Sequence, residues 1–472
     1  MSNDEYFEDE EFRELLNEYE QAARSGQSIF MDADDLADIA DYYQQEGQFD
    51  KAQQVLDRIL ELQPDSVVAL NYQVHNAINQ ENYEEAEYYL GQIIDKELPE
   101  YIYCRAEIWI AQEEIEKADN YLRECFKDVP PEEYQDYVLD VANLYTDYGY
   151  NEKALEWMMR AKQDNTDDFK EMMGRTLFGL GKYDDSERIF NELLDKNPFQ
   201  KRYWNALANT QFMKEDYGAS VTSSEYAIAI DPNDAEGILV KANALYKLEN
   251  FEDALKYFER YSEKEPDDEF GLLHQGTCLI NLGRNDDAIA KLNEALFVAP
   301  PDSEYLGDIY QELSFAYSEE GNDEKALQML DKADEHDSDK VQTLVVRGHI
   351  MLASGQVRRA EGFFRKAVVQ SDTPNETLLR IIVSIYDNHF LEAAYTLFRK
   401  YFQVIPDDFG QGYAYMALVC HDLKHYDEFL HYLKTACLLN PQECKTALGH
   451  LFPDDVEPKD YYDYIKDRMA QP

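Results

Sequence analysis

The chain has 472 residues, of which 44% are hydrophobic, and it is too long for one ordinary globular core. Its 97 acidic and 44 basic residues give a formal charge of −53, which disfavours nucleic acid and anionic membranes as partners. The acidic start lacks the features of a secretion signal, and no run approaches the roughly 20 apolar residues of a membrane span. We therefore expect a cytoplasmic protein whose six cysteines are reduced.

At the N-terminus, residues 1–32 are expected to form an acidic capping region with one helix over about residues 9–24. Phe12, Leu15 and Tyr19 fall on one face of this helix. A repeat array needs such a cap, because its terminal units otherwise expose an apolar face.

Four prolines reveal an internal period. They are spaced 34 residues apart, and each follows an amphipathic stretch that a proline would end: Pro198, Pro232, Pro266 and Pro300. A unit of 34 residues accommodates two helices and their turns. The sequence therefore predicts a tandem array of helix pairs.

Small residues mark where the two helices of each unit are expected to touch, because helices that cross closely need small side chains. An apolar residue usually follows the second small residue four positions later, as Leu292 follows Ala288. The small residues are twelve positions apart, in Ala40/Ala52, Ala106/Ala118, Ala142/Ala154, Gly174/Ser186, Ala208/Ser220, Ala242/Ala254, Gly276/Ala288, Ser314/Ala326 and Gly348/Ala360. Three further units fit less well, with Val74/Ala86, Ile382/Ala394 and Ala417/Phe429.

The predicted array covers residues 33–441 in about twelve units, and residues 442–472 are expected to form C-terminal capping helices. Within a unit, a Gly or Asn lies between the two helices, as at Asn82, Gly181, Asn250 and Gly321. These residue types tolerate the left-handed conformation that ends a helix, so we expect them to adopt it.

The segment 204–208, Trp-Asn-Ala-Leu-Ala, with Ala227 and Pro232 downstream, resembles the tetratricopeptide repeat (TPR). Residues 276–300 resemble it in the same way. The resemblance implies an all-α, right-handed superhelical solenoid of about twelve helix-turn-helix repeats with terminal capping helices. It further implies a non-enzymatic scaffold or adaptor that binds partner peptides or proteins in its concave groove. The alternative is a chaperone-like or regulatory subunit that binds basic peptides.

The residue after the first small residue of each unit is expected to face the groove. That column reads Asp41, His75, Glu107, Asn143, Arg175, Asn209, Asn243, Thr277, Phe315, His349, Val383 and Leu418. An asparagine amide offers both a donor and an acceptor, and in the resembled family asparagine at this place often holds a peptide backbone. The predicted peptide-binding residues are Asn143, Arg175, Arg202, Asn205, Asn209, Phe212, Asn243 and Tyr246; the alternative is that they are solvated polar residues.

Residues 341–370 break the acidic trend. They contain one acid, Glu361, and five basic residues, here called the basic island: Arg347, Arg358, Arg359, Arg365 and Lys366. In so acidic a molecule this island is a candidate docking surface for an acidic partner or for the acidic N-terminus of another copy; the alternative is a solvated helix face.

The nearest approach to a metal-binding pattern is the set Cys420, His421, His425, His431 and Cys437. The repeat register places a turn near His425, so these residues are expected to be core thiols and surface histidines. We expect neither a metal nor a cofactor, and the sequence leaves the oligomeric state open.

Overall fold

The computed structural model describes residues 7, 10–25, 31–45, 48–161, 165–336, 339–405, 409–453 and 456–469. Every regular element among these residues is a helix, so the all-α prediction is confirmed. The chain divides into two compact units, Met1–Pro198 and Phe199–Pro472.

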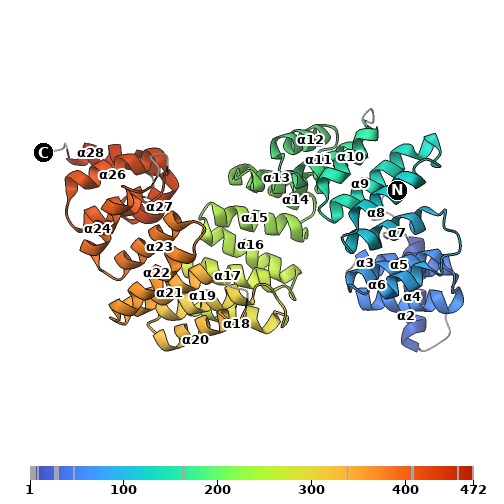
Figure 1. Cartoon of the computed structure of the whole chain (residues 1–472), viewed down its shortest axis with the longest axis horizontal. Coiled ribbons are helices and arrows are strands. Elements are labelled where there is room, and N and C mark those ends of the chain that lie inside the picture. The colour runs from blue at the N-terminus through green and yellow to red at the C-terminus, as the bar shows by residue number, and fades with distance from the viewer. Residues whose placement is uncertain are drawn as a thin grey trace. The chain divides into compact units, whose positions relative to one another are not determined.

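The first unit begins with α2 (Glu10–Ser25) and continues as helix-turn-helix pairs, shown from blue to green in Figure 1. The pairs are α3 (Ala33–Gln45) with α4 (Phe49–Leu62), α5 (Val67–Asn79) with α6 (Tyr83–Leu90), α7 (Pro99–Ala111) with α8 (Ile115–Cys125), α9 (Tyr134–Asp147) with α10 (Asn151–Met158), and α11 (Asp167–Gly179) with α12 (Tyr183–Lys196). Short 3-10 turns, η1 (Pro131–Glu133) and η2 (Met159–Ala161), precede α9 and follow α10.

The second unit continues the same pattern. Its pairs are α13 (Lys201–Met213) with α14 (Tyr217–Ile230), α15 (Ala235–Lys247) with α16 (Phe251–Lys264), α17 (Glu269–Asn281) with α18 (Asn285–Val298), α19 (Leu306–Glu319) with α20 (Asp323–Ala333), α21 (Lys340–Ala353) with α22 (Val357–Gln370), α23 (Pro374–Asp387) with α24 (Leu391–Tyr401), and α25 (Tyr413–Asp422) with α26 (Tyr426–Leu439). It ends with α27 (Pro441–Leu448), η3 (Gly449–Leu451), η4 (Pro458–Asp460) and α28 (Tyr461–Met469).

The helices α3 to α26 thus make twelve pairs in the described part of the chain, which confirms the predicted number of repeats. Even the unit that fits the pattern least, with Ala417 and Phe429, is a regular pair, α25 with α26. The predicted domain boundaries stay a prediction, because the division after Pro198 falls inside the predicted array.

Small residues allow close contact between paired helices, as predicted. A Cβ atom added to Gly276 would lie 2.5 Å from Leu292, and one added to Gly348 would lie 2.3 Å from Phe364. Leu292 and Phe364 each come four positions after the second small residue of their unit, as the sequence spacing predicts. Where that second residue is Ser186, its buried hydroxyl donates a hydrogen bond of 2.9 Å to the carbonyl of Gly174 on the partner helix. At this contact the hydrogen bond offsets the cost of burying the hydroxyl.

The turns within the pairs correct one expectation. Gly181 and Gly321 are left-handed as predicted, with φ of 69° and 71°. Asn82 is not, because its φ is −91° and its side chain instead caps α6 by accepting a hydrogen bond from the amide of Glu85. The left-handed residue is the one before it, Glu81, with φ of 56°. Asn250 likewise has a negative φ, of −85°, and follows a left-handed residue, Glu249, but its side chain makes no capping hydrogen bond.

The N-terminal helix α2 packs on the first pair through Phe12 and Tyr19, which are 2% and 8% exposed. At the other end of the chain, within the second unit, α27 contacts the turn after α15. There Gln442 Nε2 donates to the carbonyl of Leu248 at 3.3 Å, and Thr446 Oγ1 donates to the carboxylate of Glu249. The run of helices from α15 to α27 therefore returns to its own start.

None of the described helices combines the length and the apolar character that a membrane crossing requires.

Candidate functional site

In the first unit, the predicted groove residues Asn143 and Arg175 bind each other. Arg175 Nη1 donates to Asn143 Oδ1 at 2.9 Å, and Arg175 Nη2 lies 3.0 Å from Asp147 Oδ1. Asn143 Nδ2 donates to the other oxygen of Asp147 at 2.9 Å. The three side chains form a closed hydrogen-bonded set between α9 and α11, so a peptide would have to displace one of these contacts.

In the second unit, the predicted groove residues Asn205 and Asn209 both donate to Glu236 on α15. Asn205 is only 3% exposed, and its Nδ2 lies 2.8 Å from Asp234 and 3.0 Å from Glu236. Asn209 Nδ2 donates to the second oxygen of Glu236 at 2.9 Å. Desolvation and the charge of Asp234 raise the pKa of Glu236 above its usual range, and the two asparagines oppose this shift. Asn205 therefore holds α13 against α15 from a buried position.

The other predicted residues of this region, Arg202, Phe212, Asn243 and Tyr246, lie on α13 and α15. Asn243 is partly exposed, and its amide makes no hydrogen bond to another described residue. The ring of Phe212 contacts Tyr217 at a centroid distance of 5.4 Å, and that of Tyr246 contacts Phe251 at the same distance. The guanidinium of Arg202 lies over the ring of its neighbour Tyr203, 5.2 Å from the centroid.

A pocket of about 800 Å³ lies on the first helices of four successive repeats, α19, α21, α23 and α25. Three members of the predicted groove column, Phe315, His349 and Val383, line it. We call it the first-helix pocket. Its remaining lining residues include Glu319, Gln342, Arg380, Ser384, Tyr386, Asp387, His389, Tyr415 and Asp422.

Two carboxylates, Glu319 and Asp387, line the first-helix pocket, and the charge of Glu319 acts on Asp387. Loss of solvation and then the charge of Glu319 raise the pKa of Asp387 to about 6, and the nearby His389 acts in the opposite direction. Desolvation also raises the pKa of Glu319. Neither carboxylate forms an ion pair with any described residue. Like charges gathered without a counter-ion are an unfavourable arrangement that a bound cation would relieve.

The other polar groups of the first-helix pocket are paired within the chain. Arg380 Nη1 donates a hydrogen bond of 2.7 Å to Gln342 Oε1, so the guanidinium of Arg380 contacts an amide and not Glu319 or Asp387. His349 Nδ1 lies 3.0 Å from Ser384 Oγ, and burial lowers the pKa of this imidazole, which leaves it neutral at pH 7.

Aromatic rings complete the walls of the first-helix pocket. Phe315, Tyr386 and Tyr415 all line it, and Tyr386 donates a hydrogen bond of 2.6 Å to Asp422 Oδ2. Ring faces beside carboxylates attract cations. Phe315 and His349 belong to the predicted groove column. Glu319, Asp387 and Tyr415 do not, so the repeat spacing could not have identified them.

Part of the basic island is neutralised within the chain. The side chain of Arg347 is only 13% exposed and lies 2.9 Å from Asp331 and 2.6 Å from Asp334. Arg365 pairs with Glu361 at 2.6 Å.

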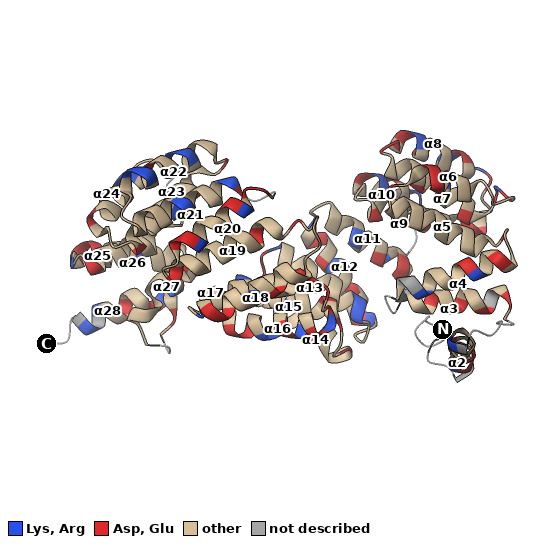
Figure 2. Cartoon of the chain, turned by 90° about the horizontal axis from the view of Figure 1, so that it is seen from below, with Lys and Arg blue, Asp and Glu red and all other residues tan. Residues whose placement is uncertain are grey.

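The remaining members of the basic island are on α22. Figure 2 shows basic residues on α22 and on α24, the second helix of the next repeat. Arg358 is exposed and forms no ion pair with a described residue, while Arg359 donates to Gln356 at 2.7 Å and Lys366 lies 5.9 Å from the ring centroid of Phe363. These helices and α23 border an apolar groove of about 570 Å³, and one of its lining residues, Val369, is 84% exposed.

The cysteines and histidines of the C-terminal repeats lie as the sequence predicts. Cys420 is fully buried, and burial raises the pKa of its thiol to about 12. His421 Nδ1 lies 3.0 Å from Asp422 Oδ1, and His425 lies at the turn immediately before α26. The other members of that set, His431 and Cys437, are both on α26.

Comparison with known proteins identifies the repeat. One family model described as tetratricopeptide repeat matches residues 171–235 and 239–304, and a second with the same description matches residues 36–66. The chain is 28% identical over 152 residues to Protein FlbA of Caulobacter vibrioides. That match covers 31% of this chain and 25% of FlbA, so the chain spans about a quarter of the length of this curated relative.

Several solved structures are similar to parts of the chain. YrrB, described as a TPR protein with an unusual peptide-binding site, is 23% identical with a TM-score of 0.35, over 40% of this chain and 95% of YrrB. MamA of Desulfovibrio magneticus RS-1 is 16% identical with a TM-score of 0.34, over 36% of this chain and 95% of MamA. A chain of the APC/C hetero-tetramer Cut9-Hcn1 is 15% identical with a TM-score of 0.36, over 94% and 95% of the two chains.

Stacked helical repeats of this class present extended surfaces that bind other proteins. The family matches agree with the prolines spaced 34 residues apart and with the twelve helix pairs. The chain therefore contains tetratricopeptide repeats, and repeats of this kind support a protein-interaction scaffold.

Proposed function

We propose that this scaffold binds a basic segment of a partner protein in the first-helix pocket of its second unit. The observation that carries the proposal is the pair of carboxylates of Glu319 and Asp387, which share the pocket and form no ion pair with any residue that the structure describes. A lysine or arginine side chain between them would replace repulsion with attraction on both sides.

The walls of the first-helix pocket support the same choice of ligand. Aromatic rings at Phe315, Tyr386 and Tyr415 suit the aliphatic stem of a long basic side chain and its cationic end. The volume of about 800 Å³ is large enough for more than one side chain. The formal charge of −53 adds a long-range attraction for basic segments, which speeds their encounter with the scaffold.

The test is binding of fluorescein-labelled 12-residue peptides in which lysine alternates with small residues, measured by fluorescence anisotropy. The double variant Glu319→Gln and Asp387→Asn keeps the shape of both side chains and removes their charge. We expect it to weaken binding by on the order of tenfold. A peptide with glutamine in place of every lysine should not bind the native chain.

A matched control separates the pocket from the general charge of the molecule. Glu259 and Glu263 are exposed on α16, and the double variant Glu259→Gln and Glu263→Gln changes the net charge by the same amount. If both double variants weaken binding equally, the attraction is non-specific and the assignment of the pocket is wrong.

The asparagines of the groove column extend this proposed surface within the second unit. The amide of Asn243 on α15 has no hydrogen-bond partner among the described residues. Asn209 on α13 shares Glu236 with Asn205. We propose that the amides of Asn209 and Asn243 pair with the backbone of a partner segment. The variant Asn243→Ala should then weaken binding of a long partner segment, and should leave the affinity of the 12-residue basic peptide unchanged if that peptide occupies the first-helix pocket alone.

The basic island supports a second candidate function, docking of an acidic amphipathic helix. The apolar groove between α22 and α24 would take its apolar face, and Arg358 would meet its acidic edge. We expect Val369→Ser to reduce the affinity of an acidic amphipathic peptide for the native chain, and Arg358→Glu to reduce it further. Unchanged affinity in both variants would leave the island as a solvated helix face.

A further inference from the structure

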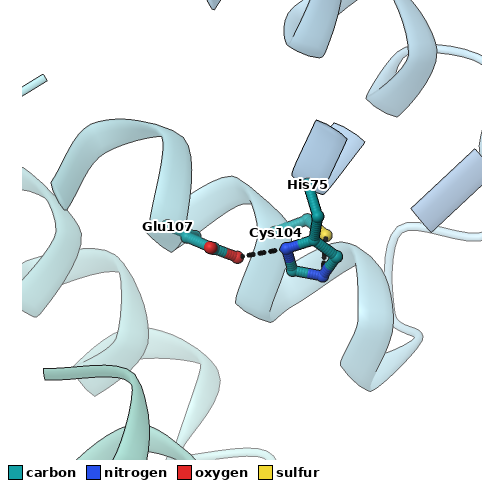
Figure 3. A group of neighbouring side chains, drawn as sticks. All are labelled: His75, Cys104 and Glu107. Atoms are coloured by element: carbon teal, nitrogen blue, oxygen red, sulfur yellow. Dashed lines mark hydrogen bonds and ion pairs between the residues drawn. The ribbon is translucent and has the colours of Figure 1, made fainter. Parts of the chain in front are cut away.

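A histidine, a cysteine and a glutamate meet between two neighbouring first helices of the first unit (Figure 3). His75 comes from α5, and Cys104 and Glu107 lie three residues apart on α7, hence on one face of that helix. His75 Nδ1 lies 2.9 Å from Glu107 Oε2, and its Nε2 lies 3.8 Å from Cys104 Sγ. One possible ligand atom from each residue lies within 4.8 Å of the other two, and no other such set of three occurs among the residues that the structure describes.

These three residue types are the ones that bind zinc. A thiolate, an imidazole nitrogen and a carboxylate oxygen hold the ion at about 2.0–2.3 Å, which places tetrahedral ligands about 3.5 Å apart. The sulfur and Nε2 of His75 are already close to that separation. Glu107 now contacts the other ring nitrogen, Nδ1, so binding of the ion at Nε2 requires its long side chain to rotate about its own bonds.

The ligand set also suits the charge of a divalent cation. When zinc binds, the Cys104 thiol would release its proton, so that a thiolate, the Glu107 carboxylate and a neutral imidazole together balance the two positive charges of the ion.

The surroundings have the features of a built site. Tyr148 donates a hydrogen bond of 3.0 Å to Glu107 Oε1, which leaves Oε2 for the ion and orients the carboxylate. Cys104 is 1% exposed, and its thiol donates a hydrogen bond of 2.6 Å to Asn71 Oδ1, which the bond to the ion would replace. The side chain of His75 is 43% exposed. An ion can therefore enter from the histidine side, and water can occupy a fourth position there.

We propose that His75, Cys104 and Glu107 form a zinc(II) site between the second and third repeats, independent of the peptide-binding surface of the second unit. The ion would join α5 to α7 and so fix the packing of two successive repeats. Because three protein ligands leave one position open, the site is of the exchangeable kind rather than a closed structural centre.

The test uses the full chain, treated with a chelator and then titrated with cobalt(II) as a spectroscopic substitute for zinc. One equivalent of cobalt should produce a sulfur-to-cobalt charge-transfer band in the near ultraviolet together with the visible bands of tetrahedral cobalt, and zinc should abolish both. The variant Cys104→Ser should lack the charge-transfer band. His75→Gln and Glu107→Gln should each weaken cobalt binding at least about tenfold.

The matched control is Cys125→Ser, which removes a half-buried thiol from α8 and should leave the cobalt spectrum unchanged. Absence of the band from the native chain, or a band that survives in Cys104→Ser, overturns the proposal.

A second measurement covers the case in which Cys104→Ser fails to fold. His75→Gln alters a partly exposed side chain and should fold normally. Zinc should then raise the melting temperature of the native chain and not that of His75→Gln, and an equal rise in both also overturns the proposal.

Discussion

Individual carboxylates of the second unit lie in environments that change how they bind protons. Desolvation, followed by the charge of Asp308, raises the pKa of Glu312 to about 7, and the pKa of Asp387 is about 6. At a pH between the usual pKa of a carboxylate and these raised values, Glu312 and Asp387 hold protons in the folded chain that they have released in the unfolded chain. The free energy of unfolding therefore decreases as the pH rises from about 4 to about 7 through these two groups.

This linkage gives a prediction at the residue scale. Asp387→Asn removes one of the two groups, so the loss of stability between pH 5 and pH 7.5 should be smaller than in the native chain. Urea unfolding followed by circular dichroism at both pH values measures the difference. Asp372→Asn, which removes an exposed charge from the segment before α23, should show the native pH dependence.

Left-handed residues in the turns allow a second prediction. Gly283 has φ of 70°, and an added Cβ would meet no atom within 4 Å, so Gly283→Ala tests backbone strain alone. We expect it to lower the free energy of unfolding by about 1–2 kcal/mol. Gly362, within α22, also has open space around its Cβ position, and Gly362→Ala should raise that free energy by about 0.5–1 kcal/mol. If chemical unfolding shows the same sign for both variants, backbone conformation does not decide the effect.

At the scale of elements, the helix pair depends on the close approach of its two small residues. Gly348 on α21 faces Phe364 on α22, and an added Cβ would lie 2.3 Å from the ring. We expect Gly348→Ala to separate the two helices and to cost about 1–3 kcal/mol. Hydrogen exchange should increase over residues 340–370 and remain unchanged in the first unit, because each repeat mainly contacts its neighbours.

The comparison for this element is Gly362→Ala on α22, which adds the same methyl group away from the contact between the helices. Faster exchange in both variants would mean that α22 is sensitive to any substitution, and that the close approach at Gly348 is not the cause.

At the scale of the whole molecule, the charge of −53 opposes compaction. Raising the salt concentration from 10 to 150 mM shortens the screening length from about 30 Å to about 8 Å. The melting temperature should therefore rise with salt, by an equal amount in sodium and potassium chloride. A fall, or a rise with only one of the two salts, would contradict screening as the cause.

Interactions within a repeat were predictable from the sequence. The prolines, the small residues twelve positions apart and the apolar residue four positions later all describe contacts between helices joined by a short turn. Such contacts depend on helix periodicity, which sequence spacing records directly. The number of repeats and the pairing of Gly276 with Leu292 follow from it. The left-handed turn position was misjudged at Asn82, because asparagine also suits the helix cap one residue later.

The sequence by itself thus determined the repeat, its length, the helix pairs and the column of residues on the first helices. Tertiary structure alone decided which side chains of that column meet others from neighbouring repeats. It placed Asn143 against Arg175, buried Asn205, left Glu319 and Asp387 in one pocket, and gathered His75, Cys104 and Glu107. The physical reason is that these contacts depend on the angle and offset between successive repeats, which come from the packing of whole helix surfaces and leave no regular spacing in the sequence.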